Sequence, residues 1–309
     1  MTTRPTKLRL SGPGLRGARV SGPLLRDLLD LVVDATRAAV RLRLEGRSTA
    51  QGPAPTWVDH AAAFDVMSIE EGSTLLSLEA APVAEAAPQQ FAQVALFGGV
   101  DGRRSCLDLM ADSLDDAVSA RVESDLYDDD LLRTFGRFER LFRHGVDLVE
   151  VADVRTVRLD RRALTTFETL KKNMPPDQRA VVAGKLDAIR HSDRMFTLVL
   201  DDGNAVRGVI ANAVDLDLIG NLWGKQVRLS GVAKFRPSGS LLRVEADSLE
   251  ESTGDASLWA AMPRPMFTEL DTRSLRRPQG PRSGIAAILG KWPGEESDDE
   301  FLRAVAELS

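Results

Sequence analysis

This sequence is poor in the residues that form covalent and metal cross-links. Its 309 residues include one cysteine, Cys106, and three histidines that lie far apart, His60, His144 and His191. A single cysteine excludes an internal disulfide and is typical of a reducing compartment. One Cys and three separated His also cannot supply the ligands of a usual structural zinc site. We therefore expect no disulfide framework, no metal site and no cofactor.

Long apolar runs and basic patches are scarce as well. No stretch approaches the 18 apolar residues of a membrane-spanning helix, and the start MTTRPTKLRLSG has no apolar run behind its charges. We therefore expect a cytoplasmic protein with no membrane partner. The net charge is −6, and no Lys or Arg occurs between Ser48 and Gly102, which makes that stretch a poor surface for nucleic acid.

Residues 1–145 mix helix and strand patterns and predict an α+β domain of unassigned role. TKLRLSG alternates as a strand does, and a long apolar helical face follows, with Ser21 as its cap and Gly46 as its stop. Residues 62–82 predict a hairpin that turns at Glu71-Gly72. Two further helices are expected over 106–122 and 131–142. Residues 146–176 predict two short strands and a helix that connect this domain to the next one.

Residues 177–250 have a different sequence pattern, which predicts short strands separated by tight turns. The expected strands are Ala180–Ile189, Met195–Leu200, Ala205–Ala211, Gln226–Phe235 and Leu241–Ser248, with one helix at Asp215–Trp223 between the third and the fourth. Gly184 and Gly231 lie where barrel strands bend sharply. This element order resembles the OB-fold, a small five-stranded β-barrel. The overall prediction is an α+β protein that contains a small OB-like barrel, followed by a linker and a short helical tail.

Each apparent catalytic or cofactor motif in the sequence has a simpler structural explanation. GPGLRG (residues 12–17) matches the spacing of a dinucleotide fingerprint, but Pro13 removes an N–H group and the helix begins only near Pro23. The adjacent His191, Ser192 and Asp193 cannot point at one another as a catalytic relay does. We therefore expect no enzyme and no catalytic residues.

The carboxylates in ESDLYDDDLL allow two interpretations. Such a cluster can bind Mg²⁺, as nuclease sites do. However, Asp128, Asp129 and Asp130 directly precede an expected helix, whose positive dipole end they would offset. The capping role is the preferred interpretation.

The barrel is a candidate for single-stranded nucleic acid, because OB modules combine exposed aromatic side chains with a basic groove. Residues 177–250 hold ten Lys or Arg and ten Asp or Glu, so their charge is balanced. The candidate contacts are Lys185, Arg190, Arg194, Phe196, Arg207, Lys234, Phe235 and Arg236. We expect Trp223, on the helix, to be buried in the core.

The chain ends in an unusual way. Residues 251–282 are rich in Ser, Pro, Arg and Gly and read as a linker, whereas residues 283–309 again carry apolar clusters. Ser297 and Glu300 form a capping box that predicts a helix over Asp298–Leu308, with Phe301 on its apolar face. Either this tail docks on the protein's own domains or it folds onto a partner.

The tail ILGKWPGEESDDEF resembles the C-terminal ends of type II antitoxins that neutralise PIN-domain ribonuclease toxins. The matching residues are Leu289, Gly290, Trp292, Gly294, Glu295, Glu296, Asp298 and Glu300. The resemblance implies a toxin–antitoxin system in which the tail wraps the toxin and a basic side chain approaches its metal-binding carboxylates. The implied partner-binding residues are Arg282, Ile288, Leu289, Lys291, Trp292, Phe301, Leu302, Val305 and Leu308.

Overall fold

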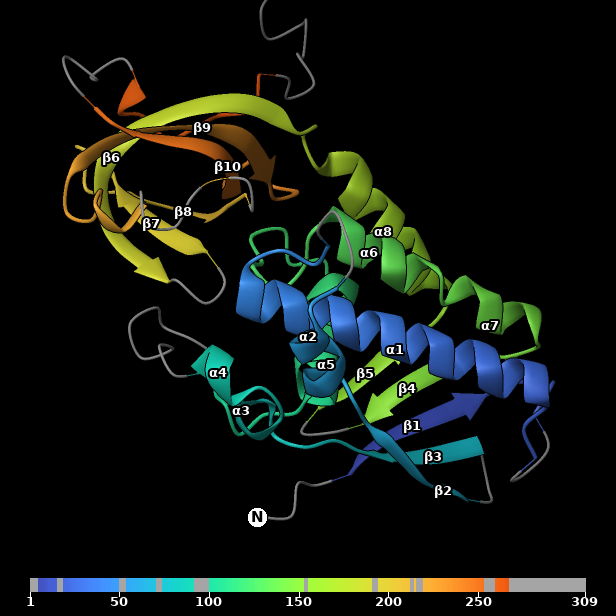
Figure 1. Ribbon diagram of the computed structural model, residues 1–309. Coiled ribbons are helices and arrows are strands. Elements are labelled where there is room, and N and C mark those ends of the chain that lie inside the picture. Colours follow the sequence, from blue (N-terminus) through green and yellow to red (C-terminus); the bar gives the residue numbers. More distant parts are fainter. Residues whose placement is uncertain are drawn as a thin grey trace, which may run out of the picture. The chain divides into compact units, whose positions relative to one another are not determined.

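The computed structural model describes residues 5–266, except for 16–18, 50–53, 71–73, 92–99, 153–154, 191–193, 212–213, 215–218 and 253–258. The chain divides into two units, Met1–Met266 and Phe267–Ser309. The first unit contains a five-stranded sheet with helices and a closed β-barrel (Figure 1). The predicted α+β class with a small barrel is therefore confirmed.

The elements of the sheet region come first in the chain. Its strands are β1 (Thr6–Ser11), β2 (Asp65–Glu70), β3 (Thr74–Glu79), β4 (Leu148–Ala152) and β5 (Thr156–Leu159). Its helices are α1 (Gly22–Glu45), α2 (Thr56–Ala61), α3 (Val83–Ala86), α4 (Pro88–Phe91), α5 (Cys106–Val118), α6 (Asp129–Gly136), α7 (Glu139–Arg143) and α8 (Arg161–Asn173). The barrel strands are β6 (Gln178–Arg190), β7 (Met195–Val199), β8 (Ala205–Ile210), β9 (Gln226–Phe235) and β10 (Leu241–Glu251).

Helix α1 begins and ends where its sequence signals predict. The Ser21 hydroxyl accepts a hydrogen bond from the Leu24 N–H at 3.4 Å, and Gly46 ends the helix in the left-handed conformation with φ 75°. The apolar face buries Leu28 and Leu31 completely. This helix packs against α5 and α6.

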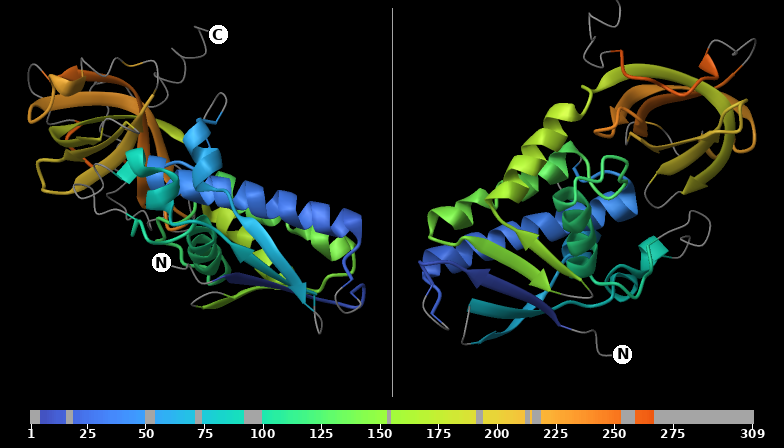
Figure 2. Two further views of the ribbon diagram at one scale, coloured as in Figure 1. Left: turned by 60° about the horizontal axis from the view of Figure 1, so that its bottom comes forward. Right: turned by 180° about the vertical axis from the view of Figure 1, so that it is seen from behind.

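The sheet has the strand order β2-β3-β1-β4-β5 and is antiparallel throughout. Its helices lie over one face, as both views of Figure 2 show. Alternation along β1 follows from this arrangement: Leu8 and Leu10 are buried, whereas Lys7 and Arg9 are exposed. The segment 146–176, expected as a connection, supplies β4, β5 and α8 to this sheet and its core.

The helix expected over 131–142 is divided in two. Helix α6 ends at Gly136, a poor helix former, and α7 starts at Glu139. The break lets the chain turn so that Phe135 at the end of α6 and Leu141 in α7 are both fully buried. Phe135 also packs on Phe167 of α8, with ring centroids 5.9 Å apart.

The barrel closes in the order β10-β8-β7-β6-β9. All neighbouring pairs are antiparallel except β8 and β10, which are parallel. This is the strand order of an OB-like barrel, and the five expected strands match the observed ones closely. A Cβ on Gly231 would lie 2.3 Å from the Glu245 carbonyl oxygen, so only glycine permits the close approach of β9 and β10 there.

The expectation for Trp223 is wrong. Its side chain is 68% exposed, and residues 221–224 form a turn instead of the end of a helix. The indole N–H donates to the Asp187 carbonyl oxygen at 3.0 Å, which fixes the ring against β6 from outside. Leu222, the preceding residue, enters the barrel core in its place.

Candidate functional site

A buried ion pair joins the start of α6 to the barrel. The Asp128 carboxylate caps α6 by accepting from the Leu131 N–H at 3.0 Å, which confirms the capping interpretation. The same carboxylate accepts from the Ser48 hydroxyl at 2.5 Å and from the Arg243 guanidinium of β10 at 3.0 Å. Asp128 is 5% exposed and Arg243 is 7% exposed. One acidic side chain therefore connects a helix start, the chain after α1 and the barrel.

The surroundings of Asp128 keep it ionised. Burial alone would raise its pKa, but the charge of Arg243 and the hydrogen bonds from Ser48 and Leu131 outweigh this, so the pKa lies below its usual value. Removal of Arg243 would leave Asp128 buried without that charge, whereas removal of Asp128 would leave the buried Arg243 with the Glu245 carboxylate, whose oxygen lies 3.0 Å from its Nε. The pair therefore contributes to how the sheet region and the barrel are held together.

The acidic segment before α6 makes further contacts with the β9–β10 turn. The Arg236 guanidinium donates to the Asp125 carboxylate, with its Nε 3.0 Å from the oxygen. The Ser240 hydroxyl donates to the Glu123 carboxylate at 2.7 Å and holds the pKa of that group below its usual value. Of the carboxylates that the sequence grouped as a candidate Mg²⁺ site, Glu123, Asp125 and Asp128 are thus engaged with the barrel. Among the described residues, no group of three or more His, Cys, Asp or Glu side chains is arranged to hold a metal ion.

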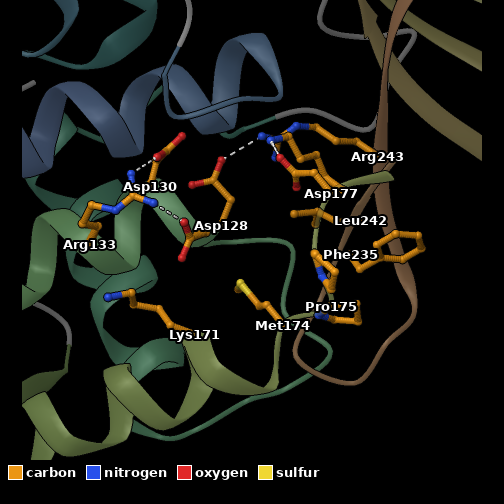
Figure 3. A pocket seen from close by; sticks show the side chains of 13 residues that line it. Asp128, Asp130, Arg133, Lys171, Met174, Pro175, Asp177, Phe235, Leu242 and Arg243 are labelled. Atoms are coloured by element: carbon orange, nitrogen blue, oxygen red, sulfur yellow. Dashed lines mark hydrogen bonds and ion pairs between the residues drawn. The ribbon is translucent and has the colours of Figure 1, made fainter. Parts of the chain in front are cut away.

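A pocket of about 340 Å³ opens beside this junction (Figure 3). It is lined by Asp128, Asp129, Asp130, Arg133, Lys171, Met174, Pro175, Pro176, Asp177, Lys234, Phe235, Leu242 and Arg243. Figure 3 shows Asp128 and Arg243 meeting at one side, with Met174 and Pro175 from the end of α8 nearby.

The charges around the pocket neutralise one another. Arg133 contacts Asp129 and Asp130, and Lys234 contacts Asp177. Lys171 also lines the pocket, and its ammonium contacts Glu168 of the same helix at 3.0 Å. The chemistry of the pocket is that of a mixed-charge contact surface.

The structure separates the residues proposed to contact nucleic acid. Phe196 and Phe235 are buried in the barrel, 1% and 4% exposed, so neither offers a ring to a base. Arg190 is also buried and donates to the Leu44 carbonyl oxygen at the end of α1. These side chains hold the barrel together and fasten it to the helices.

The remaining members of the set are closer to the surface. Lys185 and Arg207 are exposed, whereas Arg194 is half-buried and donates to the Ala211 carbonyl oxygen at 2.9 Å. Lys234 and Arg236 are half-buried and engaged by Asp177 and Asp125, as described above. The exposed pair lies on the strands on either side of β7, where Lys185 pairs with Val199 and Arg207 with Thr197.

Sequence reasoning missed two features of the site. The contact of Asp128 with Arg243 joins positions 115 residues apart and has no local signature. The indole of Trp223 is exposed because its N–H donates to the β6 backbone from outside the barrel. The apolar residues beside Trp223 in the sequence give no sign of this hydrogen bond. The tail residues proposed to bind a partner, from Arg282 to Leu308, lie outside the described residues, as do Glu71, Gly72 and His191.

Comparison with known proteins gives no relative. The chain matches no family model, no curated protein and no solved structure. Of the helices in the described part, none combines the length and the apolar character needed to cross a membrane.

Proposed function

We propose that this protein is a non-enzymatic, antitoxin-like protein that binds and occludes a PIN-domain ribonuclease through residues 283–309. The observation that carries the proposal is the tail pattern, in which Trp292 lies between Gly290 and Gly294 and is followed by an acidic segment, as in such antitoxins.

The end of the described part of the chain contacts the barrel. Gln178, at the start of β6, donates to the Arg264 carbonyl oxygen at 2.6 Å and accepts from the Met266 N–H at 3.0 Å. This pair of hydrogen bonds fixes the last described residues against the barrel.

The mechanism would be occlusion. Trp292, Phe301, Leu302 and Val305 would fill apolar grooves of the ribonuclease, since aromatic anchors supply most of the binding energy in such contacts. Lys291 or Arg282 would compete with the metal ion for the carboxylates of the ribonuclease. Neither step requires catalysis by this chain.

Co-expression tests this proposal. The full chain is expressed with the product of the neighbouring gene, and growth and co-purification are measured. We expect a complex and relief of growth arrest, and we expect loss of both in Trp292→Ala/Phe301→Ala. Trp223→Ala is the matched control, because it removes an exposed tryptophan from the barrel and leaves the tail intact. A wild-type chain that forms no complex and gives no relief would contradict the proposal.

The exposed indole favours a second candidate function, the binding of single-stranded nucleic acid by the barrel. Trp223 is fixed at its N–H and free at its ring face, and residues 224 and 225 pair with the backbone of Leu186, next to exposed Lys185. A fixed aromatic ring beside a cation is the arrangement on which bases stack.

Fluorescence anisotropy with a labelled single-stranded oligonucleotide tests this second function. We expect binding that weakens as salt rises and that falls about tenfold or more in Trp223→Ala. Trp259→Ala, which replaces another exposed tryptophan, is the control. Equal affinity of the two variants, or no binding at low salt, would remove this function.

A further inference from the structure

The two edges of the five-stranded sheet differ in how they are protected. At one edge, β5 is four residues long, carries the exposed Arg158, and buries Val157 and Leu159 under α5 and α8. At the other edge, β2 pairs with β3 on one side and, within the described part of the chain, with no strand on the other. Its residues from Asp65 to Ile69 are all exposed.

The exposed edge is apolar. Val66, Met67 and Ile69 are 42%, 59% and 38% exposed. The register pairs Val66 with Leu78 and Ile69 with Leu76, and both leucines are fully buried. Paired residues share a face, so Val66 and Ile69 extend the buried layer of the sheet to its rim.

Proteins usually protect a free edge strand with Lys, with Pro or with a covering element, because an open edge accepts another strand. The sequence of β2, DVMSIE, contains neither Lys nor Pro. Its one irregularity is a bulge between Val66 and Ser68. An edge of this kind is suited to strand addition, in which the backbone provides affinity and alternate side chains provide specificity.

Charge distinguishes the possible occupants. Asp65 lies directly opposite Glu79 on β3, and among the described residues neither has a cationic partner. A second copy would bring another acid-bearing β2 to this edge and would not neutralise Asp65 and Glu79, and like charges across a strand pair are unfavourable. A strand with Lys or Arg near Asp65 would instead neutralise the uncompensated acids.

We propose that β2 is a docking site for an extended, basic segment of a partner protein, which adds to the sheet as a sixth strand. Apolar residues at alternate positions of that segment would cover Val66 and Ile69, and a Lys or Arg would meet Asp65 and Glu79. This proposal does not rest on the proposed function.

Hydrogen exchange and peptide binding test this proposal. The probe is a synthetic peptide that alternates valine and threonine between lysine pairs, and the control peptide has glutamates in place of the lysines. With the full chain, we expect the lysine peptide to slow amide exchange at residues 65–69 and to leave β5 unchanged. We expect its affinity to fall as salt rises.

Three variants sharpen the test. Ile69→Lys removes apolar contact and should weaken binding about tenfold. Asp65→Lys should reverse the preference, so that the glutamate peptide binds better. Val122→Lys is the matched control, because Val122 is 42% exposed, as Val66 is, and lies outside the sheet. All three positions are exposed, so wild-type thermal midpoints are expected.

Three results would overturn the proposal. The first is the absence of protection at residues 65–69, and the second is an unchanged charge preference in Asp65→Lys. The third is a concentration-dependent dimer, measured by analytical ultracentrifugation, that Ile69→Lys abolishes, because the occupant would then be a second copy of the chain.

Discussion

In the barrel every strand has a neighbour on both sides, whereas the sheet ends at β2 and at β5. Each region also has its own apolar core, one under the helices and one inside the barrel. Polar contacts join the two regions, Asp128 with Arg243, Asp125 with Arg236 and Glu123 with Ser240. Met195 and Val209 of the barrel also lie against Gly46 at the end of α1. The two cores are therefore separate, and charged side chains contribute to the contact between them.

This difference predicts which changes affect one region and which affect both. Substitutions inside a core should act on that region alone. Loss of a junction charge should affect the protein as a whole, and it should respond to pH. The following predictions are arranged from the largest expected effect to the smallest.

Asp128→Ala should have the largest effect. It removes the cap of α6 and leaves the buried Arg243 guanidinium with only the Glu245 carboxylate, so we expect a loss of about 3 kcal/mol in the free energy of unfolding. Urea unfolding followed by circular dichroism measures this loss. Asp129→Ala is the matched control, because its carboxylate is 46% exposed and only contacts the exposed Arg133. Equal losses in the two variants would contradict the role of the buried pair.

Gly231→Ala should disturb the barrel alone. The added Cβ would lie 2.3 Å from the Glu245 carbonyl oxygen, so β9 and β10 must separate, at a cost of about 1–3 kcal/mol. Gly220→Ala adds the same atom where no other atom lies within 4 Å and should be nearly neutral. Thermal unfolding compares the two. Exchange at β1 and β4 should stay at the wild-type rate in both variants, and faster exchange there would show that the two cores are not separate.

Acid should weaken the junction. The folded-state pKa of Asp128 lies below the unfolded value of about 3.9. The stabilisation that this pair gives is therefore fully present above about pH 5 and is lost as the pH falls below about 4 toward the folded pKa. The difference in unfolding free energy between the wild type and Asp128→Asn should be constant from pH 7 to about pH 5 and then shrink. A difference that grows on acidification would contradict this sign.

Asp125→Asn should have the smallest effect. Its side chain is 55% exposed, so its ion pair with Arg236 is screened by solvent and should contribute about 0.2–1 kcal/mol. The effect should decrease in high salt, which the buried Asp128 pair resists. Urea titrations at low and high salt measure the stability loss and its dependence on salt. A salt-independent loss larger than that of Asp128→Ala would contradict the description of the Asp125 pair as a weak, exposed ion pair.

The sequence was a good guide wherever local signals decide the structure. Ser21 and Gly46 fixed the ends of α1, and the tight turns fixed the five barrel strands to within a few residues. The bounds of β9 were predicted as they are found, because alternation, a bend glycine and a turn all agree there.

The features that could not be predicted from the sequence depend on contacts between residues far apart in the chain. Trp223 was expected in the core because tryptophan beside apolar residues usually packs inside, but its N–H finds a backbone acceptor on the outside of β6. Phe196 and Phe235 were candidates for base stacking, since the sequence does not reveal which strand face points into a barrel. Asp128 was recognised as a cap, but its partner Arg243 lies 115 residues further along the chain.

The most direct test of the proposed function is a titration of ribonuclease activity. The purified product of the neighbouring gene is assayed on an RNA substrate with Mg²⁺, where the proposal predicts cleavage, and the full chain is added in increasing amounts. We predict that activity falls to zero near one equivalent of the wild-type chain, and that Trp292→Ala/Phe301→Ala shifts the titration by about tenfold or more. Full ribonuclease activity at an excess of the wild-type chain, or equal inhibition by the variant, would contradict the account.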